Sequence, residues 1–322
     1  MKISRLLPLI GLAIFAYLLA SIDLSLVAAS FVQLDPLFFL AALALSAFVI
    51  VLKAVKWQVI IRSYGLHFSF LDALKGWLVG FAIGLVTPGK IGDLARSYYL
   101  KEKANIGKSI TTVVVDRIAD IFVLFLLAIV GLSVFVSRYV RDDLLLFATY
   151  GLFFVFVGCV ALFSRKRVVT ALLRPLFNAF VSDSRKGVLK GVYDDFYAGI
   201  DVMLGKKAIL LASLGVTFLI WAVTILYAYV LAIAMGLQIP YDFLFFTFPV
   251  VGLLFALPIS FSGLGTREAS LVFFLSYLGI PAETAIAYSL MMLVVDYILG
   301  AVGFGLWTRH PIRLRSLAGQ AG

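Results

Sequence analysis

The sequence predicts an all-α polytopic membrane protein with about six full transmembrane helices and two re-entrant helical hairpins in an inverted repeat. Three observations predict it: an apolar composition, two polar glycine-rich breaks inside apolar sequence, and an uneven distribution of basic residues. Of the 322 residues, 63% are hydrophobic and 14% are charged, and the mean hydropathy is +1.10. Soluble domains are roughly half apolar and a quarter charged, so lipid must surround most of this chain.

Long apolar runs predict the full spans, because about 20 apolar residues are needed to cross the hydrocarbon core. The runs are Leu6–Ile22, Pro36–Val55, Ser109–Val136, Leu144–Phe163, Ala208–Gly236 and Thr284–Trp307. The first resembles a signal peptide, but no clear cleavage site follows it, which favours an uncleaved signal anchor. We therefore expect one transmembrane domain over residues 1–322, located in the cell membrane.

Two further apolar stretches are shorter and are interrupted. Phe70–Val86 ends in Thr87-Pro88-Gly89, and Phe243–Leu257 runs into the polar break Pro258–Glu268 before a second short arm. None of these arms is long enough to cross comfortably. They predict re-entrant hairpins at about 70–108 and 243–283, inside a first half of about 36–136 and a second half of about 208–307.

The charges predict that both termini lie in the cytoplasm, because cytoplasmic loops carry an excess of Lys and Arg. This orientation places most basic residues inside, namely Lys53, Lys56, Arg62, Lys90, Arg96, Lys101, Lys103, Lys108, those of loop 164–207, and Arg309, Arg313 and Arg315. This orientation is possible only if both hairpins re-enter the membrane from the side on which they began. Within the loop, Val188–Met203 has apolar residues at helical spacing, which favours an amphipathic helix on the membrane surface over a regulatory or partner site.

The two halves resemble each other at matching places. Each has an arginine and a carboxylate at its break and an aspartate in the long span that follows: Asp93, Arg96 and Asp120, against Arg267, Glu268 and Asp296. The span before each break runs inward in one half and outward in the other, so the halves are expected to be inverted. Broken segments in corresponding places of two halves are typical of transporters with a site near the membrane midplane.

The residue types at the breaks predict an anion site. Glycine and proline free backbone groups that are tolerated at membrane depth only when buried or lining a wet cavity, and arginines attract an anion there. The predicted substrate-binding residues are Thr87, Pro88, Gly89, Gly92, Asp93, Arg96, Arg117, Ser260, Gly263, Gly265, Arg267 and Glu268. The alternative is that these charges are ion pairs that hold the hairpins to the spans.

Three aspartates are the predicted proton- or ion-coupling set: Asp116, Asp120 and Asp296. Asp116 and Asp120 flank Arg117 and should stay ionised, because a neighbouring arginine stabilises a carboxylate. Asp296 has no arginine within one helical turn, which makes it the better candidate proton carrier. A protonated aspartate with a purely structural role is the alternative for Asp296.

Several function classes are disfavoured. The net charge of +10 does not indicate nucleic-acid binding, because the basic residues fall in short loops between spans. One cysteine and two distant histidines exclude an intrachain disulfide and argue against a zinc site. No nucleotide or dinucleotide fingerprint is present, and no cofactor is expected. No Gly-x-Ser-x-Gly frame surrounds Ser260 or Ser262, so a serine nucleophile is not expected.

At these breaks the chain resembles the lysylphosphatidylglycerol synthase transmembrane-region family of flippase-like membrane proteins. The resemblance covers roughly residues 5–308 and rests on Thr87-Pro88-Gly89-Lys90-Ile91-Gly92-Asp93 with Arg96, on Asp116-Arg117-x-x-Asp120, and on Pro258-x-Ser260-x-x-Gly263-x-Gly265-x-Arg267-Glu268. It implies lipid handling. In the best-known member this region is thought to move aminoacylated phosphatidylglycerol between leaflets, and a separate soluble domain makes that lipid. These 322 residues contain no such domain, so the resemblance does not imply lysyl transfer.

This chain departs from the family pattern at two positions. Asp93 stands where a glutamate is common, and Asp296 where the repeat often has a basic residue. The first change is conservative, whereas the second replaces a positive charge with a negative one in the C-terminal half.

The expected function is that of a lipid translocase, not an enzyme, which moves a phosphate-containing lipid between leaflets through a polar cavity without ATP hydrolysis. One alternative is a membrane enzyme or enzyme subunit acting on a lipid-linked phosphate, with Asp116, Asp120 and Glu268 holding a divalent metal. Another is a secondary transporter of a small anion. The expected partner is a membrane lipid such as an anionic phospholipid, a polyprenyl phosphate or a glycolipid, and a homodimer is one assembly that the sequence allows.

Overall fold

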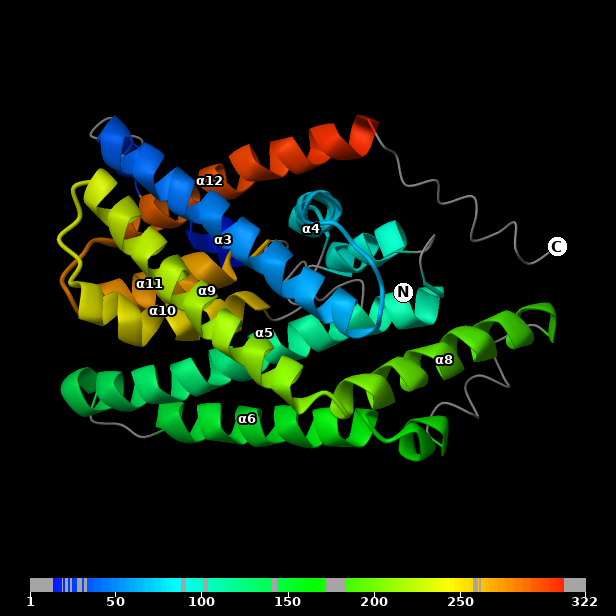
Figure 1. Ribbon diagram of the computed structural model, residues 1–322. Helices are drawn as coiled ribbons and strands as arrows, with labels where there is room; N and C mark the ends of the chain where they lie inside the picture. The colour runs from blue at the N-terminus through cyan, green and yellow to red at the C-terminus, as the bar shows by residue number, and fades with distance from the viewer. Residues whose placement is uncertain are drawn as a thin grey trace.

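The computed structural model describes residues 14–18, 20, 23, 25–27, 31, 34–87, 91–100, 104–140, 144–171, 183–256, 260 and 262–309, and the regular elements in them are all helical (Figure 1). Five helices are long and apolar enough to cross a membrane: α3 (Pro36–Ser63), α5 (Ile106–Phe135, continued by the π-helical turn Val136–Val140), α6 (Leu144–Phe163), α9 (Lys207–Ala234) and α12 (Ala282–Arg309). The chain is therefore an all-α polytopic membrane protein.

The five long helices coincide with five of the six predicted spans. The remaining predicted span, Leu6–Ile22, falls largely outside the described residues. Within it, only residues 14–18 and 20 are described, and they are helical. Local sequence explains where the helices begin. Asp35 accepts hydrogen bonds from the backbone amides of Leu37 and Phe38, and Pro36 occupies the first turn of α3, where no amide donor is needed.

Four shorter helices occupy the two predicted hairpin regions: α4 (Phe70–Leu85) with η2 (Ile91–Leu100), and α10 (Tyr241–Ala256) with α11 (Thr266–Ser276). With 16 residues each, α4 and α10 are about 24 Å long at 1.5 Å per residue, less than the roughly 30 Å of the hydrocarbon core. In each pair the two helices pack on each other. Their lengths fit arms that enter the membrane without crossing it.

Glycine allows the sharp geometry at both breaks. In the first, a Cβ atom on Gly92 would lie 2.5 Å from the carbonyl carbon of Ile83, so only glycine lets η2 approach the end of α4. In the second, Gly265 precedes α11 with a φ of +84°, a conformation that glycine adopts without strain. The amide of Gly265 donates to the carboxylate of Glu268 at 2.6 Å, which satisfies one free donor at the start of the helix.

The long helices pack across the two halves. Helices α3 and α9 lie side by side, α10 packs on α5, and α4 packs on α12 (Figure 1). The last two contacts are close because of glycine: a Cβ atom on Gly131 of α5 would collide with the backbone of Phe246, and one on Gly303 of α12 would collide with the backbone of Leu78. Each of the two 16-residue helices, α4 and α10, is thus held by a long helix from the other end of the sequence.

The structure corrects the assignment of two basic residues. Lys53 and Lys56 were expected in a cytoplasmic loop, yet α3 continues as one helix to Ser63 and both residues lie within it. The Lys56 side chain is 1% exposed. A lysine can remain inside an apolar helix when a carboxylate on a neighbouring helix pairs with it, and that partner could not be seen in the local sequence.

The predicted amphipathic helix Val188–Met203 is part of α8 (Asp183–Leu204), which packs against the start of α5. The hydroxyl of Thr111 donates to the carbonyl of Phe196 at 3.0 Å, and that of Tyr64 donates to the carbonyl of Gly199 at 3.0 Å. The backbone of this helix is therefore hydrogen-bonded to α5 and to the residue that follows α3. Whether its apolar face contacts lipid stays a prediction.

We predict that the close contact between α12 and α4 is sensitive to a single methyl group. Gly303→Ala should lower the stability of the purified protein by about 1–3 kcal/mol, because the added Cβ meets backbone that cannot move aside. Gly305→Ala, two residues along the same helix, has no atom within 4 Å of its added Cβ and is the matched control. Thermal unfolding in detergent measures both, and equal melting temperatures would contradict the packing.

Candidate functional site

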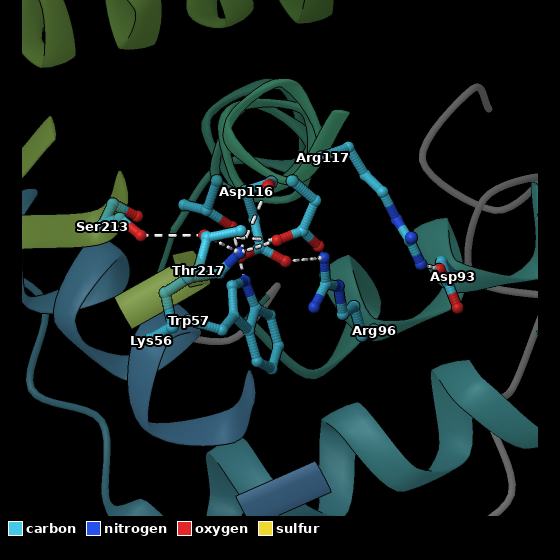
Figure 2. Close-up of polar contacts among 10 residues, drawn as sticks. Lys56, Trp57, Asp93, Arg96, Asp116, Arg117, Ser213 and Thr217 are labelled. Carbon is cyan, nitrogen blue, oxygen red and sulfur yellow. Dashed lines mark hydrogen bonds and ion pairs between the residues drawn. The ribbon is translucent and has the colours of Figure 1, made fainter. Parts of the chain in front are cut away.

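A buried lysine joins α3 to α5 and α9. The ammonium of Lys56 lies 2.8 Å from a carboxylate oxygen of Asp116, forms a second ion pair with Asp120, and donates to the hydroxyl of Thr217 at 3.2 Å (Figure 2). Asp116 and Asp120 are one helical turn apart on α5, so both can face the same cation. This arrangement pairs two carboxylates at membrane depth with a lysine from another helix.

Arg96 extends this network to the first hairpin. Its guanidinium lies 2.5 Å from the second oxygen of Asp116 and over the Trp57 ring, with 5.0 Å to the ring centroid. The ring is fixed in turn, because its indole N–H donates to the Thr112 hydroxyl at 3.1 Å. Arg96 is 1% exposed, so its charge is balanced inside the protein. We define Lys56, Arg96, Asp116 and Asp120 as the α5 charge network.

A further ion pair ties η2 to α5 beside this network. Arg117 pairs with Asp93, and Figure 2 shows the Arg117 side chain reaching away from Asp116 toward the η2 hairpin. The Asp93 side chain is 8% exposed and that of Arg117 is 33% exposed. Arg117 is therefore held at the boundary between the hairpin and an open space.

The second half has its own charge cluster, made by α11 and α12. The Nε–H of Arg267 donates to the hydroxyl of Ser289 at 2.7 Å, and that hydroxyl donates to the Glu268 carboxylate at 2.7 Å. A terminal nitrogen of Arg267 lies 3.7 Å from Asp296. Arg96 and Arg267 thus occupy comparable positions, since each binds the long helix that follows its own hairpin, 20 and 22 residues further along the chain.

The two clusters border one cavity of about 280 Å³. Helices of both halves line it, namely α3, α4, α5, α9, α10, α11 and α12. Its charged residues are Lys53, Arg117, Asp120, Arg267 and Asp296, and its aromatic residues are Trp77, Phe81, Trp221, Tyr227, Phe248 and Phe255. A space with a few charged groups and mostly apolar walls is the usual composition of a site for an amphipathic ligand.

The predicted site residues divide into three groups. The cavity is lined by Arg117, Arg267, Asp120 and Asp296. Behind its wall lie Asp93, Arg96, Asp116 and Glu268. The two breaks contain Thr87, Gly92, Ser260, Gly263 and Gly265. Pro88 and Gly89 lie outside the described residues. Arg117 and Arg267 therefore meet at one cavity, whereas Arg96 does not reach it.

Asp296 has an arginine neighbour, contrary to the prediction from the sequence. No arginine is near it in the sequence, but α11 places Arg267 3.7 Å from its carboxylate. A role of the three aspartates in proton or ion coupling stays a prediction.

Sequence reasoning missed the two lysines of α3 as site residues. The available signal was their spacing, since Lys53 and Lys56 lie one turn apart at the end of a long apolar run and share one face of a continued helix. No metal was predicted, and the three carboxylates that the enzyme alternative would need, Asp116, Asp120 and Glu268, are not assembled among the described residues. Asp116 and Asp120 are bound by Lys56, and the described residues contain no group of three or more His, Cys, Asp or Glu side chains placed to hold a metal ion.

Removing the lysine at the centre of the α5 charge network should destabilise the protein. We predict that Lys56→Met costs about 3–5 kcal/mol, because Asp116 and Asp120 then remain buried without their shared cation. Lys75→Met, at an exposed position of α4, is the control and should change the melting temperature little. An unchanged melting temperature for Lys56→Met would show that the network does not hold the helices together.

Comparison with known proteins shows which family the chain is related to. Its residues 8–303 match the family described as the lysylphosphatidylglycerol synthase TM region. A UPF0104 membrane protein of Methanothermobacter thermautotrophicus is 24% identical over 284 residues, which are 84% of each chain. Another of Methanocaldococcus jannaschii is 24% identical over 312 residues, 93% of this chain and 92% of that one.

One relative has a name that states an activity. The protein named glycosyltransferase AglD, from Haloferax volcanii, is 25% identical over 294 residues, which are 78% of this chain but 46% of that protein. The family match extends over nearly all of the spans and both hairpin regions described above. The chain belongs to the lysylphosphatidylglycerol synthase transmembrane-region family.

Proposed function

We propose that this protein is a lipid translocase, which moves a phosphate-containing lipid between leaflets without hydrolysing ATP. The observation that carries the proposal is the cavity lined by both halves, with Arg117 from one side and Arg267 from the other. Charged residues at membrane depth are costly and usually mark a substrate or ion pathway. Family membership supports the assignment, because the matching family is a membrane region named for a lipid synthase.

The size of the cavity suits a headgroup better than a whole lipid. Ligand pockets for drug-sized molecules have roughly 300–1,000 Å³, and this one has about 280 Å³. The headgroup would occupy the charged centre, beside aromatic side chains such as Trp77 and Trp221, while the acyl or prenyl tails stay in the bilayer. Moving only the headgroup through protein avoids the cost of dragging its charge through hydrocarbon.

We further propose that the two halves are inverted repeats, with the pairs α4–η2 and α10–α11 as re-entrant hairpins that gate the cavity from opposite sides. The contacts support this, because each one has a counterpart. Helix α5 packs on α10 as α12 packs on α4, and η2 packs on α5 as α11 packs on α12. In such an arrangement one hairpin can open while the other stays closed, which gives alternating access.

An enzyme or enzyme subunit acting on a lipid-linked phosphate is the second candidate. The relative named glycosyltransferase AglD favours it, although the matched region is less than half of that protein. Under both candidates the cavity would hold a lipid headgroup. They differ in whether the lipid leaves the protein chemically changed.

The proposed topology predicts which loops share a side of the membrane. If the hairpins re-enter, cysteines at Ser69 and Asn105 should be labelled from the cytoplasmic side, and cysteines at Gln238 and Glu283 from the outer side. The background would be Cys159→Ser, because Cys159 is exposed. Labelling of the two members of either pair from opposite sides would mean that the hairpin crosses the membrane.

The proposed function predicts that the cavity arginines are needed for transport. Arg117→Gln and Arg267→Gln should each slow lipid movement in proteoliposomes at least about tenfold, because a hydrogen bond to a charged group contributes roughly 1.5–3 kcal/mol. Arg138→Gln is the control, since Arg138 pairs with Asp242 at an exposed position away from the cavity. Full transport by both cavity variants would contradict the assignment, and release of a chemically altered lipid would favour the enzyme.

A further inference from the structure

Lys53 is the one cavity cation whose charge is not matched by a carboxylate ion pair among the described residues. Its ammonium lies over the Trp77 ring, 5.3 Å from the ring centroid, and the carboxylate that attracts it most is Asp120, which already pairs with Lys56. The other cavity cations have carboxylates, since Arg117 pairs with Asp93 and Arg267 faces Asp296. The wall formed by the first half therefore carries one surplus positive charge.

The wall formed by the second half has the opposite surplus. Arg267 lies 3.5 Å from Glu268 and 3.7 Å from Asp296, so two carboxylates share one guanidinium. The nitrogen that faces Glu268, Nη2, is buried and makes no hydrogen bond, so its pairing with Glu268 is long. The other terminal nitrogen, Nη1, is the one that lies 3.7 Å from Asp296.

Among the described residues, the charges around the cavity balance. The charged cavity residues, with the ion pairs and the α5 charge network that continue from them, comprise five cations and five carboxylates: Lys53, Lys56, Arg96, Arg117 and Arg267, with Asp93, Asp116, Asp120, Glu268 and Asp296. A ligand with a net charge would leave this buried set unbalanced, which is costly in a medium of low dielectric constant. A ligand without net charge but with separated charges would fit both walls.

We propose that the cavity selects a zwitterionic headgroup, with a phosphate bound by Lys53 and Arg267 and an ammonium group near the carboxylate of Asp296. The inference rests on the proposed function and names its substrate class. Lys53 then determines specificity by supplying the charge that a phosphate needs on the first-half wall. The remaining charges fix the orientation of the headgroup, since reversing it would bring like charges together.

The test measures which lipid the purified protein retains from an equal mixture of phosphatidylethanolamine, phosphatidylglycerol and diacylglycerol with identical acyl chains. Native mass spectrometry of the full chain should show phosphatidylethanolamine retained at least about tenfold over the other two, because it alone makes both the phosphate and the ammonium contact. Free phosphoethanolamine at millimolar concentration should compete if the headgroup alone is recognised, and a lack of competition would show that the lipid tails contribute to binding.

Two variants should change lipid retention in different ways. Asp296→Asn leaves the cavity with a surplus positive charge and should move retention toward phosphatidylglycerol, whereas Lys53→Gln leaves a surplus negative charge and should reduce retention of both phosphate lipids. Lys75→Gln, at an exposed position of α4, is the control. Melting temperatures would identify a variant that has lost its fold, and Lys53→Met would then replace Lys53→Gln.

The outcomes separate the two proposals. Equal retention of phosphatidylethanolamine and phosphatidylglycerol, unchanged by Asp296→Asn, would overturn the zwitterionic headgroup and leave lipid transport standing. Retention of none of the three lipids, together with no transport of any, would overturn both. Preference for phosphatidylglycerol in the unaltered protein would show that Lys53 and the two arginines act as a site for a simple anion.

Discussion

The architecture depends on the pairing of buried charges, above all that of Lys56 with Asp116 and Asp120. A lysine buried between membrane-spanning helices is tolerated only because carboxylates from α5 surround it. These carboxylates in turn need a cation. The pairing fixes α3 against α5, Thr217 brings in α9, and Arg96 adds the η2 hairpin. Apolar surfaces in lipid give little drive for helices to associate, so such contacts determine which faces meet.

Close backbone contacts provide the second constraint. Gly131 and Gly303 let the long helix of each half touch the first hairpin arm of the other half, and both positions leave no room for a side chain. Small residues at such contacts are the common way for membrane helices to gain packing energy. Because the arms are held by opposite halves, a movement of one half relative to the other would move a hairpin as well. This coupling is what the proposed gating requires.

The sequence predicted much of the fold, because apolar run length and glycine breaks are local properties. It placed five long helices, and it separated them from the shorter helices α4, η2, α10 and α11. It assigned Lys53 and Lys56 to a loop because a charged residue near the end of an apolar run has the same local appearance whether it meets water or a carboxylate. The Arg267–Asp296 contact was also hidden, since its partners are on different helices and 29 positions apart. Pairing between helices is a property of the tertiary fold.

The most direct test is a structure of the protein determined in lipid nanodiscs, with attention to density in the cavity. The account predicts headgroup density between Lys53 on α3 and Arg267 on α11, with its tails leaving between helices toward the bilayer. Such density should be absent from a Lys53→Gln, Arg267→Gln double variant of unchanged fold. A cavity that holds only water in the unaltered protein, with ordered lipid confined to the outer faces of helices such as α6, would contradict it.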